Sequence, residues 1–333
     1  MDTNNNRLTS TEITNLFTQY IQETMSICVS KYVLDTVRDS EVLSLFEFSL
    51  QLSIKHVKKL NEFFDKENFP VPDGFTDKDV NQEAPPLFVD NFWLHYLHTM
   101  SNIGLSSYSL TLATSIRPDI RDFYFQCNID AMEIDNKCVE ILLSKGLYEK
   151  PPYFSNPKEV EYISNLGYSL DVIGKKRPLN TAEAGNIFFN LKKTSLAKAI
   201  SVGFSQVTKN NELRKYLETN ISDINKNYSA FSSLLQAENL HVPKLLDTYV
   251  TNSIVSPFSD RLMALLTGFL TSAAISYYGT ALAASLRIDL IGQNEKAIIG
   301  ILKQLTKFGS VVINNGWVEK LPEADDRKEL PVN

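Results

Sequence analysis

The second half of the chain repeats the first, and this internal duplication constrains the fold more than any other feature. Leu8-Thr-Ser-Thr-Glu12 returns as Leu179-Asn-Thr-Ala-Glu183, at an offset of 171 residues. Ala113-x-Ser-Ile-Arg-x-Asp-Ile120 returns as Ala283-x-Ser-Leu-Arg-x-Asp-Leu290, at an offset of 170. Three further matches pair Glu67–Pro72 with Glu238–Pro243, Phe88–Asp90 with Phe258–Asp260, and Gly146–Pro152 with Gly316–Pro322. Self-similarity at a nearly fixed period indicates two copies of one structural unit.

We expect the first copy over residues 1–150 and the second over 179–323, with a loose charged tail at 324–333. The segment 151–178 between them contains four prolines and reads as a linker, because proline disfavours helix at the residue before it. Its Lys175-Lys176-Arg177 cluster is predicted to be a solvated part of that linker.

Each copy predicts four helices. In the first copy the first helix begins near Thr9, and the other three cover about 40–66, 90–117 and 119–145. Thr9-x-x-Glu12 and Asn180-x-x-Glu183 are capping boxes, in which two orphan N–H groups are satisfied reciprocally. Gly146 and Gly316 stand where a glycine commonly ends a helix.

Two short turns and one long crossover, residues 67–89, distinguish this pattern from a plain up-and-down bundle. That connectivity is typical of the ferritin-like four-helix bundle. The predicted fold class is therefore all-α, a tandem duplication of a ferritin-like four-helix bundle with long crossovers between the second and third helices.

Charge and composition exclude several classes of function. Asp+Glu is 39 and Lys+Arg is 33, a net charge of −6, which argues against a nucleic-acid-binding protein. The polar N-terminus is not typical of a signal peptide, and the three cysteines, Cys28, Cys127 and Cys138, read as reduced thiols. We therefore expect a cytoplasmic protein.

The third helix of each copy carries no Asp, Glu, Lys or Arg over residues 91–116 and 262–286. Both segments are long enough to span a membrane but are half polar, so no membrane insertion is expected. We expect them instead to be enclosed by protein and to form contacts between the two bundles.

No nucleotide-binding, hydrolase or P-loop motif is present, and no catalytic residue or cofactor is predicted. A di-iron bundle needs two Glu-x-x-His pairs and two further glutamates. Glu238-x-x-His241 is the one such pair, and it lies at the end of a helix. We therefore predict no dinuclear metal centre and no metal ligands.

Five residues are candidates for a polar pocket or a satisfied polar core: His56, His95, His98, Tyr108 and Glu133. His56 lies on the apolar stripe of the second helix, where the copy has Asn227, and is expected to be a hydrogen-bonded core histidine. Tyr108 and Tyr278 are repeat-equivalent and are expected to be buried rings with hydrogen-bonded hydroxyls. Arg117-x-Asp119 and Arg287-x-Asp289 are expected to complement helix dipoles at a turn.

Four phrases resemble an uncharacterised family of duplicated ferritin-like proteins from bacilli, domain of unknown function 3231: Ser26-Ile-Cys-Val29, Gly74-Phe-Thr-Asp77, Ser256-Pro-Phe-Ser-Asp260 and Tyr278-Gly-x-Ala-Leu-Ala-Ala-Ser285. The resemblance covers nearly the whole chain and implies a distant similarity to a spore coat protein family on the same bundle. It implies no activity.

Two functions follow as hypotheses. The first is a structural or interaction protein linked to the spore or to stress in a Gram-positive bacterium, with an unknown protein partner or self-association. The second is a small-molecule-binding or oxidoreductase-like bundle with a polar pocket between helices. A concave polar cavity with convergent side chains would favour the second.

Overall fold

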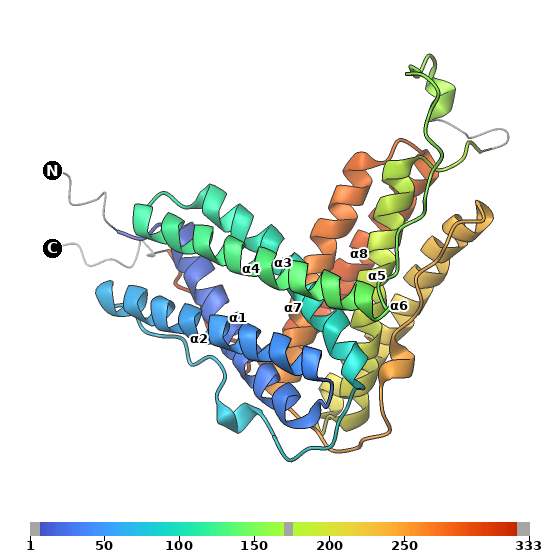
Figure 1. Cartoon of the computed structure of the whole chain (residues 1–333). Helices are drawn as coiled ribbons and strands as arrows, with labels where there is room; N and C mark the ends of the chain where they lie inside the picture. Colours follow the sequence, from blue (N-terminus) through green and yellow to red (C-terminus); the bar gives the residue numbers. More distant parts are fainter. Residues whose placement is uncertain (1–6, 170–175, 325–333) are drawn as a thin grey trace, which may run out of the picture.

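The computed structural model describes residues 7–169 and 176–324, which form eight α-helices in two groups of four (Figure 1). The first group is α1 (Ser10–Thr36), α2 (Ser40–Lys66), α3 (Asp90–Thr114) and α4 (Pro118–Ser144). The second is α5 (Thr181–Val207), α6 (Asn211–Ala237), α7 (Asp260–Ala284) and α8 (Ile288–Asn314). The described chain is thus an all-α tandem duplication of a four-helix bundle, with a long α2–α3 and α6–α7 crossover in each copy.

The helix boundaries follow from local chemistry. Both capping boxes are formed, Thr9 with Glu12 and Asn180 with Glu183. Gly146 and Gly316 follow α4 and α8 with φ of 65° and 66°, a left-handed conformation that glycine adopts without strain. The third helix ends at Thr114, three residues before the predicted end at Arg117, because Ser115 is extended and the N–H groups of Ile116 and Arg117 donate to Glu12 instead of to the helix.

The two crossovers meet each other and relate the bundles by an approximate two-fold axis. Val80 pairs with Phe258 and Phe88 pairs with Val250 through isolated antiparallel bridges. These are repeat-equivalent contacts made in both directions, the pattern expected of an isologous interface. Figure 1 shows the crossovers together at the lower edge of the molecule, where the two bundles meet.

The segments that follow α4 and α8 also cross between bundles. The Glu149 carboxylate accepts a hydrogen bond from the Lys244 amide at 2.9 Å. Its repeat-equivalent, Glu319, accepts one from the Asp73 amide, also at 2.9 Å. Each bundle is therefore held by the crossover of the other.

One hydrophobic core cluster joins the two bundles and includes residues of both predicted third helices, now α3 and α7. In it the Tyr32 ring packs edge-on against Phe258, with centroids 5.3 Å apart. At the equivalent place on the other side stands Gly203, where an added Cβ would lie 2.7 Å from the Phe88 ring. The absence of a side chain at Gly203 lets that crossover approach α5 closely.

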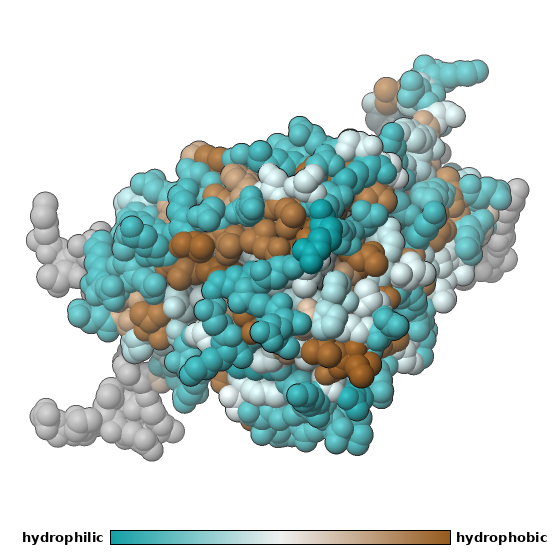
Figure 2. Space-filling view, turned by 60° about the horizontal axis from the view of Figure 1, so that its bottom comes forward, coloured by the Kyte–Doolittle hydropathy of each residue, from teal (hydrophilic) through white to brown (hydrophobic). Residues whose placement is uncertain are grey.

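Helix α7 is the one described helix that is long and apolar enough to cross a membrane by length and composition. It packs against α5 and α8 within the second bundle, as core helices of bundles do. The outer surface is mixed: on the face in Figure 2, hydrophobic side chains form short strips among hydrophilic ones.

Candidate functional site

A polar cavity of about 210 Å³ lies between the two bundles. Helix α3 contributes His95, His98 and Asn102, and α4 contributes Asp135. Helix α5 supplies a second set across the cavity, and the α6–α7 crossover closes it: Phe188, Phe189, Lys192, Lys193 and Lys244. Since no single bundle contains all of these elements, the pocket exists only when the two bundles are docked.

The cations of this pocket are not neutralised by ion pairs. Lys193 Nζ donates to the Asn102 side-chain oxygen at 2.8 Å and lies 4.8 Å from the centre of the Phe189 ring. Lys192 Nζ lies over the Tyr148 ring, 4.4 Å from its centre. In the described part of the chain, no ion pair joins Lys192, Lys193 or Lys244 to a carboxylate. The two α5 lysines, Lys192 and Lys193, therefore line one cavity with aromatic rings and an amide as their nearest partners, and Lys244 lies at its exposed rim.

The two carboxylates of the pocket are already engaged by hydrogen bonds. Asp135 accepts from the Ser101 hydroxyl at 3.0 Å and from the Asn102 amide. Glu149 accepts from the Lys244 backbone. Three lysines against two carboxylates give the pocket a formal charge of +1 when all three lysines are protonated and its histidines are neutral.

The pocket holds its histidines neutral. Burial, together with nearby Lys193 and Lys192, lowers the pKa of His98 to about 3. Burial and Lys192 lower the pKa of His95 to about 4. His98 Nε2 lies 3.6 Å from Asp135 Oδ1, so a neutral imidazole faces a carboxylate at the pocket wall. At pH 7 both rings can donate or accept hydrogen bonds without adding charge.

The approximate two-fold places an equivalent set of residues on the other side of the interface, and the lysines of α5, both histidines and Asp135 have no charged or titratable counterpart there. The repeat-equivalents of Lys192, His95 and Asp135 are apolar: Ile21, Leu265 and Leu305. They belong to the hydrophobic clusters of the core. The equivalent of His98 is Gly268, where an added Cβ would overlap the Phe308 ring. The fold therefore does not require Lys192, His95, His98 or Asp135, because the other side is built without them; there Glu319 forms an ion pair with Arg261 at 2.8 Å.

A second polar cluster fills the centre of the first bundle. His56 Nδ1 lies 2.7 Å from Glu23 Oε1, and its Nε2 lies 2.9 Å from Asp130 Oδ2. Tyr108 donates to the same Glu23 oxygen at 3.1 Å. Burial by itself would lower the pKa of His56, but the charges of Glu23 and Asp130 raise it far above its ordinary value. The cluster is an imidazolium between two carboxylates, and a cavity of about 100 Å³ lies beside it.

The centre of the second bundle is neutral. Tyr278, the equivalent of Tyr108, lies 3.4 Å from the Thr194 hydroxyl, and Thr194 is the equivalent of Glu23. A cavity of about 70 Å³ there is lined by Asn190, whose buried Nδ2 has no hydrogen-bond partner among the described residues. Lys193 lines both this cavity and the pocket between the bundles.

A third polar arrangement occurs in both bundles and is structural. Arg117 and Arg287 each form two hydrogen bonds with the aspartate two residues ahead, at 2.7–2.9 Å and 2.8–3.0 Å. Glu12 and Glu183 each accept hydrogen bonds from two backbone N–H groups in the turn between the third and fourth helices of their own bundle. Paired in this way, Arg and Asp fix a turn rather than face a ligand.

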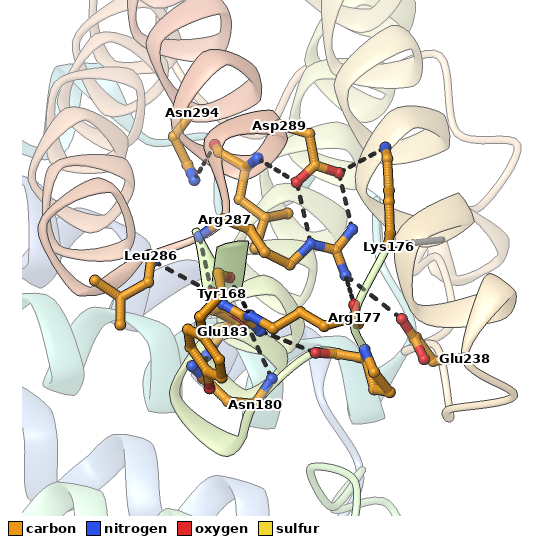
Figure 3. A network of polar contacts seen from close by, with 12 residues as sticks. Tyr168, Lys176, Arg177, Asn180, Glu183, Glu238, Leu286, Arg287, Asp289 and Asn294 are labelled. Atoms are coloured by element: carbon orange, nitrogen blue, oxygen red, sulfur yellow. Dashed lines mark hydrogen bonds and ion pairs between the residues drawn. The ribbon is translucent and has the colours of Figure 1, made fainter. Parts of the chain in front are cut away.

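In the second bundle, Lys176 and Arg177 join this arrangement (Figure 3). Arg177 forms an ion pair with Glu183 at 2.7 Å, and Lys176 forms one with Asp289 at 2.9 Å. The prediction of a solvated basic cluster is therefore wrong for Arg177, whose side chain is 13% exposed. The buried Glu183 carboxylate at the start of α5 attracts the Arg177 guanidinium, and this ion pair explains why Arg177 is buried. Lys175 lies outside the described residues.

The structure separates the five candidate residues into three groups. His95 and His98 line the pocket between the bundles. His56 and Tyr108 belong to the cluster around Glu23, where His56 is hydrogen-bonded as predicted. Glu133 lies outside both, half exposed on α4 with its carboxylate 3.5 Å from Lys137.

The single Glu-x-x-His pair does not converge on one point. Glu238 faces Arg287, with 3.5 Å between the charged atoms, and the His241 ring packs against Phe188. Over residues 7–169 and 176–324, no three His, Cys, Asp or Glu side chains are grouped to hold a metal ion. Sequence reasoning missed Lys192 and Lys193 as pocket residues. The signal that could have found them is their replacement by Ile21 and Gln22 in the other copy.

The fold and the site define a class: an all-α protein of two fused four-helix bundles with a cationic pocket at their interface. The chain belongs to the family described as a protein of unknown function (DUF3231), which matches residues 1–160 and 168–330. Among solved structures it is similar to a protein of Bacillus halodurans provisionally described as a spore coat protein, with 18% identity and a TM-score of 0.43. That match covers 46% of this chain and 100% of the other. A comparison with curated proteins finds no significant match.

Proposed function

We propose that this protein binds a small organic anion in the pocket between its two bundles. The observation that carries the proposal is the pair of lysines, Lys192 and Lys193, that line the cavity without an ion-pair partner among the described residues. Uncompensated charge in a partly buried site is unfavourable, and a bound carboxylate or phosphate would supply the missing partner. Phe188, Phe189 and Tyr148 add apolar surface for the carbon skeleton of the ligand.

The asymmetry of the interface supports the same proposal. The Arg117 and Arg287 turns, which are structural, occur on both sides of the approximate two-fold. The cationic residues occur on one side, and the other side is filled by Phe308. A cavity of about 210 Å³ is smaller than the sites that hold drug-sized molecules, so a metabolite with few carbon atoms fits it best.

The test is a binding screen on the full chain with small carboxylates and phosphates, read by thermal unfolding and then by calorimetry. A ligand at 100 times its Kd should stabilise the protein by about 2.7 kcal/mol. Lys192→Gln should weaken binding about 10- to 100-fold, since a hydrogen bond to a charged group contributes about 1.5–3 kcal/mol. Lys215→Gln, which removes an exposed lysine on α6, is the matched control and should change nothing. Binding that is equally strong in both variants would contradict the site.

The predicted role in the spore or in stress remains a proposal beside this one, as do the ferritin-like assignment of the bundle, the cytoplasmic location and self-association. The short hydrophobic strips on the surface are compatible with a protein partner (Figure 2). In a structural protein of this kind, binding of a small anion between the bundles would regulate its association with a partner.

A further inference from the structure

We propose that Lys193 forms a reversible imine with the carbonyl carbon of a small anionic aldehyde or ketone, such as a 2-oxo acid, in the pocket between the bundles. This inference rests on the proposed function, because it names the chemical class of anion that the same pocket takes. It assigns Lys193 a covalent role and leaves Lys192 and Lys244 as the partners of the carboxylate.

Lys193 is placed as a nucleophile rather than as a surface charge. Its side chain leaves α5 and reaches the wall that separates the pocket from the interior cavity of the second bundle. Its amine donates one hydrogen bond, to the neutral Asn102 side chain. An amine held by a neutral acceptor keeps its lone pair once it loses a proton.

Lys198, one turn and a half further along α5, provides a contrast within the same helix. It is also buried, but its amine forms an ion pair with Asp247 at 2.8 Å. A carboxylate partner holds a lysine as an ammonium ion, which is not a nucleophile. Lys193, which is partly buried, has no such partner among the described residues, so the two lysines differ in the property that matters for imine chemistry.

The electrostatic surroundings favour the neutral amine. Burial and the charge of Lys192 lower the pKa of Lys193 to about 7, against the opposing charge of Asp135. At pH 7 about half of the Lys193 side chains would then be neutral, whereas an ordinary lysine of pKa about 10.4 is almost wholly protonated. A neighbouring cation that activates a desolvated lysine in this way is a known route to Schiff-base nucleophiles.

The step balances without a redox partner. The Nζ lone pair attacks the carbonyl carbon, and the carbonyl π electrons move to its oxygen. A proton passes from nitrogen to oxygen, giving a carbinolamine. The carbinolamine then loses its hydroxyl group with a proton as water, leaving the C=N bond. His98, with Asp135 behind it at 3.6 Å, lines the same cavity and, as a neutral imidazole, can form a hydrogen bond with the departing oxygen.

Trapping by reduction tests the proposal on the full chain. The protein is incubated with glyoxylate, pyruvate, 2-oxobutyrate or 2-oxoglutarate and sodium cyanoborohydride, and the modified lysine is located by peptide mass spectrometry. We expect at least one of these acids to label Lys193 at one site per chain, at least about tenfold faster than Lys215. Acetone, which has the carbonyl but no charge, should label it more slowly. Lys193→Arg should abolish the label. Lys193→Met should abolish it as well, which would show that the loss is not caused by a bulky guanidinium blocking the pocket.

The pH profile separates Lys193 from an ordinary lysine. Labelling should rise with pH to a midpoint near 7, the pKa that its surroundings give it. The charged and titratable groups that face the pocket are Lys192 on α5, His95 and His98 on α3, Asp135 on α4, Glu149 after α4, and Lys244 on the crossover. Lys192→Gln should move the midpoint upward, and a shift of about one unit lowers the neutral fraction at pH 7 roughly fivefold.

Two outcomes overturn the inference, and a second measurement separates them. Calorimetry with lactate and succinate, which are anions without a reactive carbonyl, reports the pocket alone. If these bind but none of the four oxo acids labels Lys193 faster than Lys215, the imine is wrong and the anion site stands. If neither binding nor labelling occurs, both the imine and the proposed function fail.

Discussion

The centres of the two bundles are built on equivalent helices, but one interior contains charged residues and the other contains neutral ones. In the first, Glu23, His56 and Asp130 form a buried row of charged hydrogen bonds. The corresponding residues of the second are neutral: Thr194, Asn227 and Gly300. Both interiors keep a tyrosine at the same place, hydrogen-bonded to the first member of the set. The comparison teaches that the capped helices and the Arg–Asp turns, which are present twice, carry the fold, while the interior positions are free to take different chemistry.

The largest difference between the bundles should appear when the middle of the charged row is removed. His56→Leu leaves Glu23 and Asp130 as buried carboxylates without a cation between them. We expect the free energy of unfolding to fall by about 3–5 kcal/mol, the usual cost of breaking a buried ion pair on one side. Asn227→Leu, at the equivalent place in the neutral bundle, should change it by less than about 1 kcal/mol. Urea unfolding followed by circular dichroism measures both, and equal losses would contradict the comparison.

The charged row should also give the first bundle a pH dependence that the second lacks. The pKa of His56 is raised in the folded state, so its proton is retained on folding. Its contribution to stability is complete below the unfolded pKa of about 6.5 and is lost as the pH rises toward the folded value. The difference in unfolding free energy between the wild type and His56→Asn should therefore shrink above pH 6.5, by at most about 1.4 kcal/mol per pH unit.

Two other histidines of the same bundle change its stability with pH in the opposite direction, so both must be present in the two proteins compared. Burial lowers the pKa of His95 to about 4 and that of His98 to about 3. Their contribution to stability is present above pH 6.5 and is lost as the pH falls below it. A difference between wild type and His56→Asn that grows between pH 7 and 9 would show that His56 is not the cation of the row.

The smallest effect is expected when the whole row is made neutral. The triple variant Glu23→Thr, His56→Asn, Asp130→Ala gives the first bundle an interior like that of the second and leaves no buried charge unpaired. Its stability should lie within about 1–2 kcal/mol of the wild type, because well-matched neutral groups can replace a buried ionic network at little cost. The same denaturation measurement checks it. A triple variant less stable than His56→Leu would mean that the charges hold the bundle together.

Much of the fold could be predicted because its signals are local. The capping boxes at Thr9 and Asn180, the helix-ending Gly146 and Gly316, and the proline-rich crossovers each act within a few residues of their position in the sequence. The duplication then supplied a second, independent reading of every helix. The expectation that the uncharged third helices are enclosed by protein also came from local composition, and both contribute to the shared core.

The pocket could not be predicted in the same way. Lys192 and Lys193 stand side by side in an amphipathic helix, a pattern that is usually solvated. Their burial depends on α3, about 90 residues earlier, docking across the interface, and no local pattern reports that. The link from His56 to Glu23 and Asp130 likewise joins residues 33 and 74 positions apart. The available signal was a residue-by-residue comparison of the two copies. A charged residue in one copy whose repeat-equivalent is apolar, such as Asp135 and Leu305, marks a position that the shared fold does not fix.

The approximate two-fold between the bundles has a consequence for ligand stoichiometry. In a homodimer of a single repeat, symmetry would place every side chain at both equivalent sites, so a pocket and its filled counterpart could not coexist. Joining the two copies in one chain removes that restriction. Lys192 can then line an open site on one side while Phe308 occupies the space beside Gly268 on the other. Covalent fusion thus allows a structurally symmetric scaffold to be chemically one-sided, with one ligand per chain where a symmetric dimer would take two.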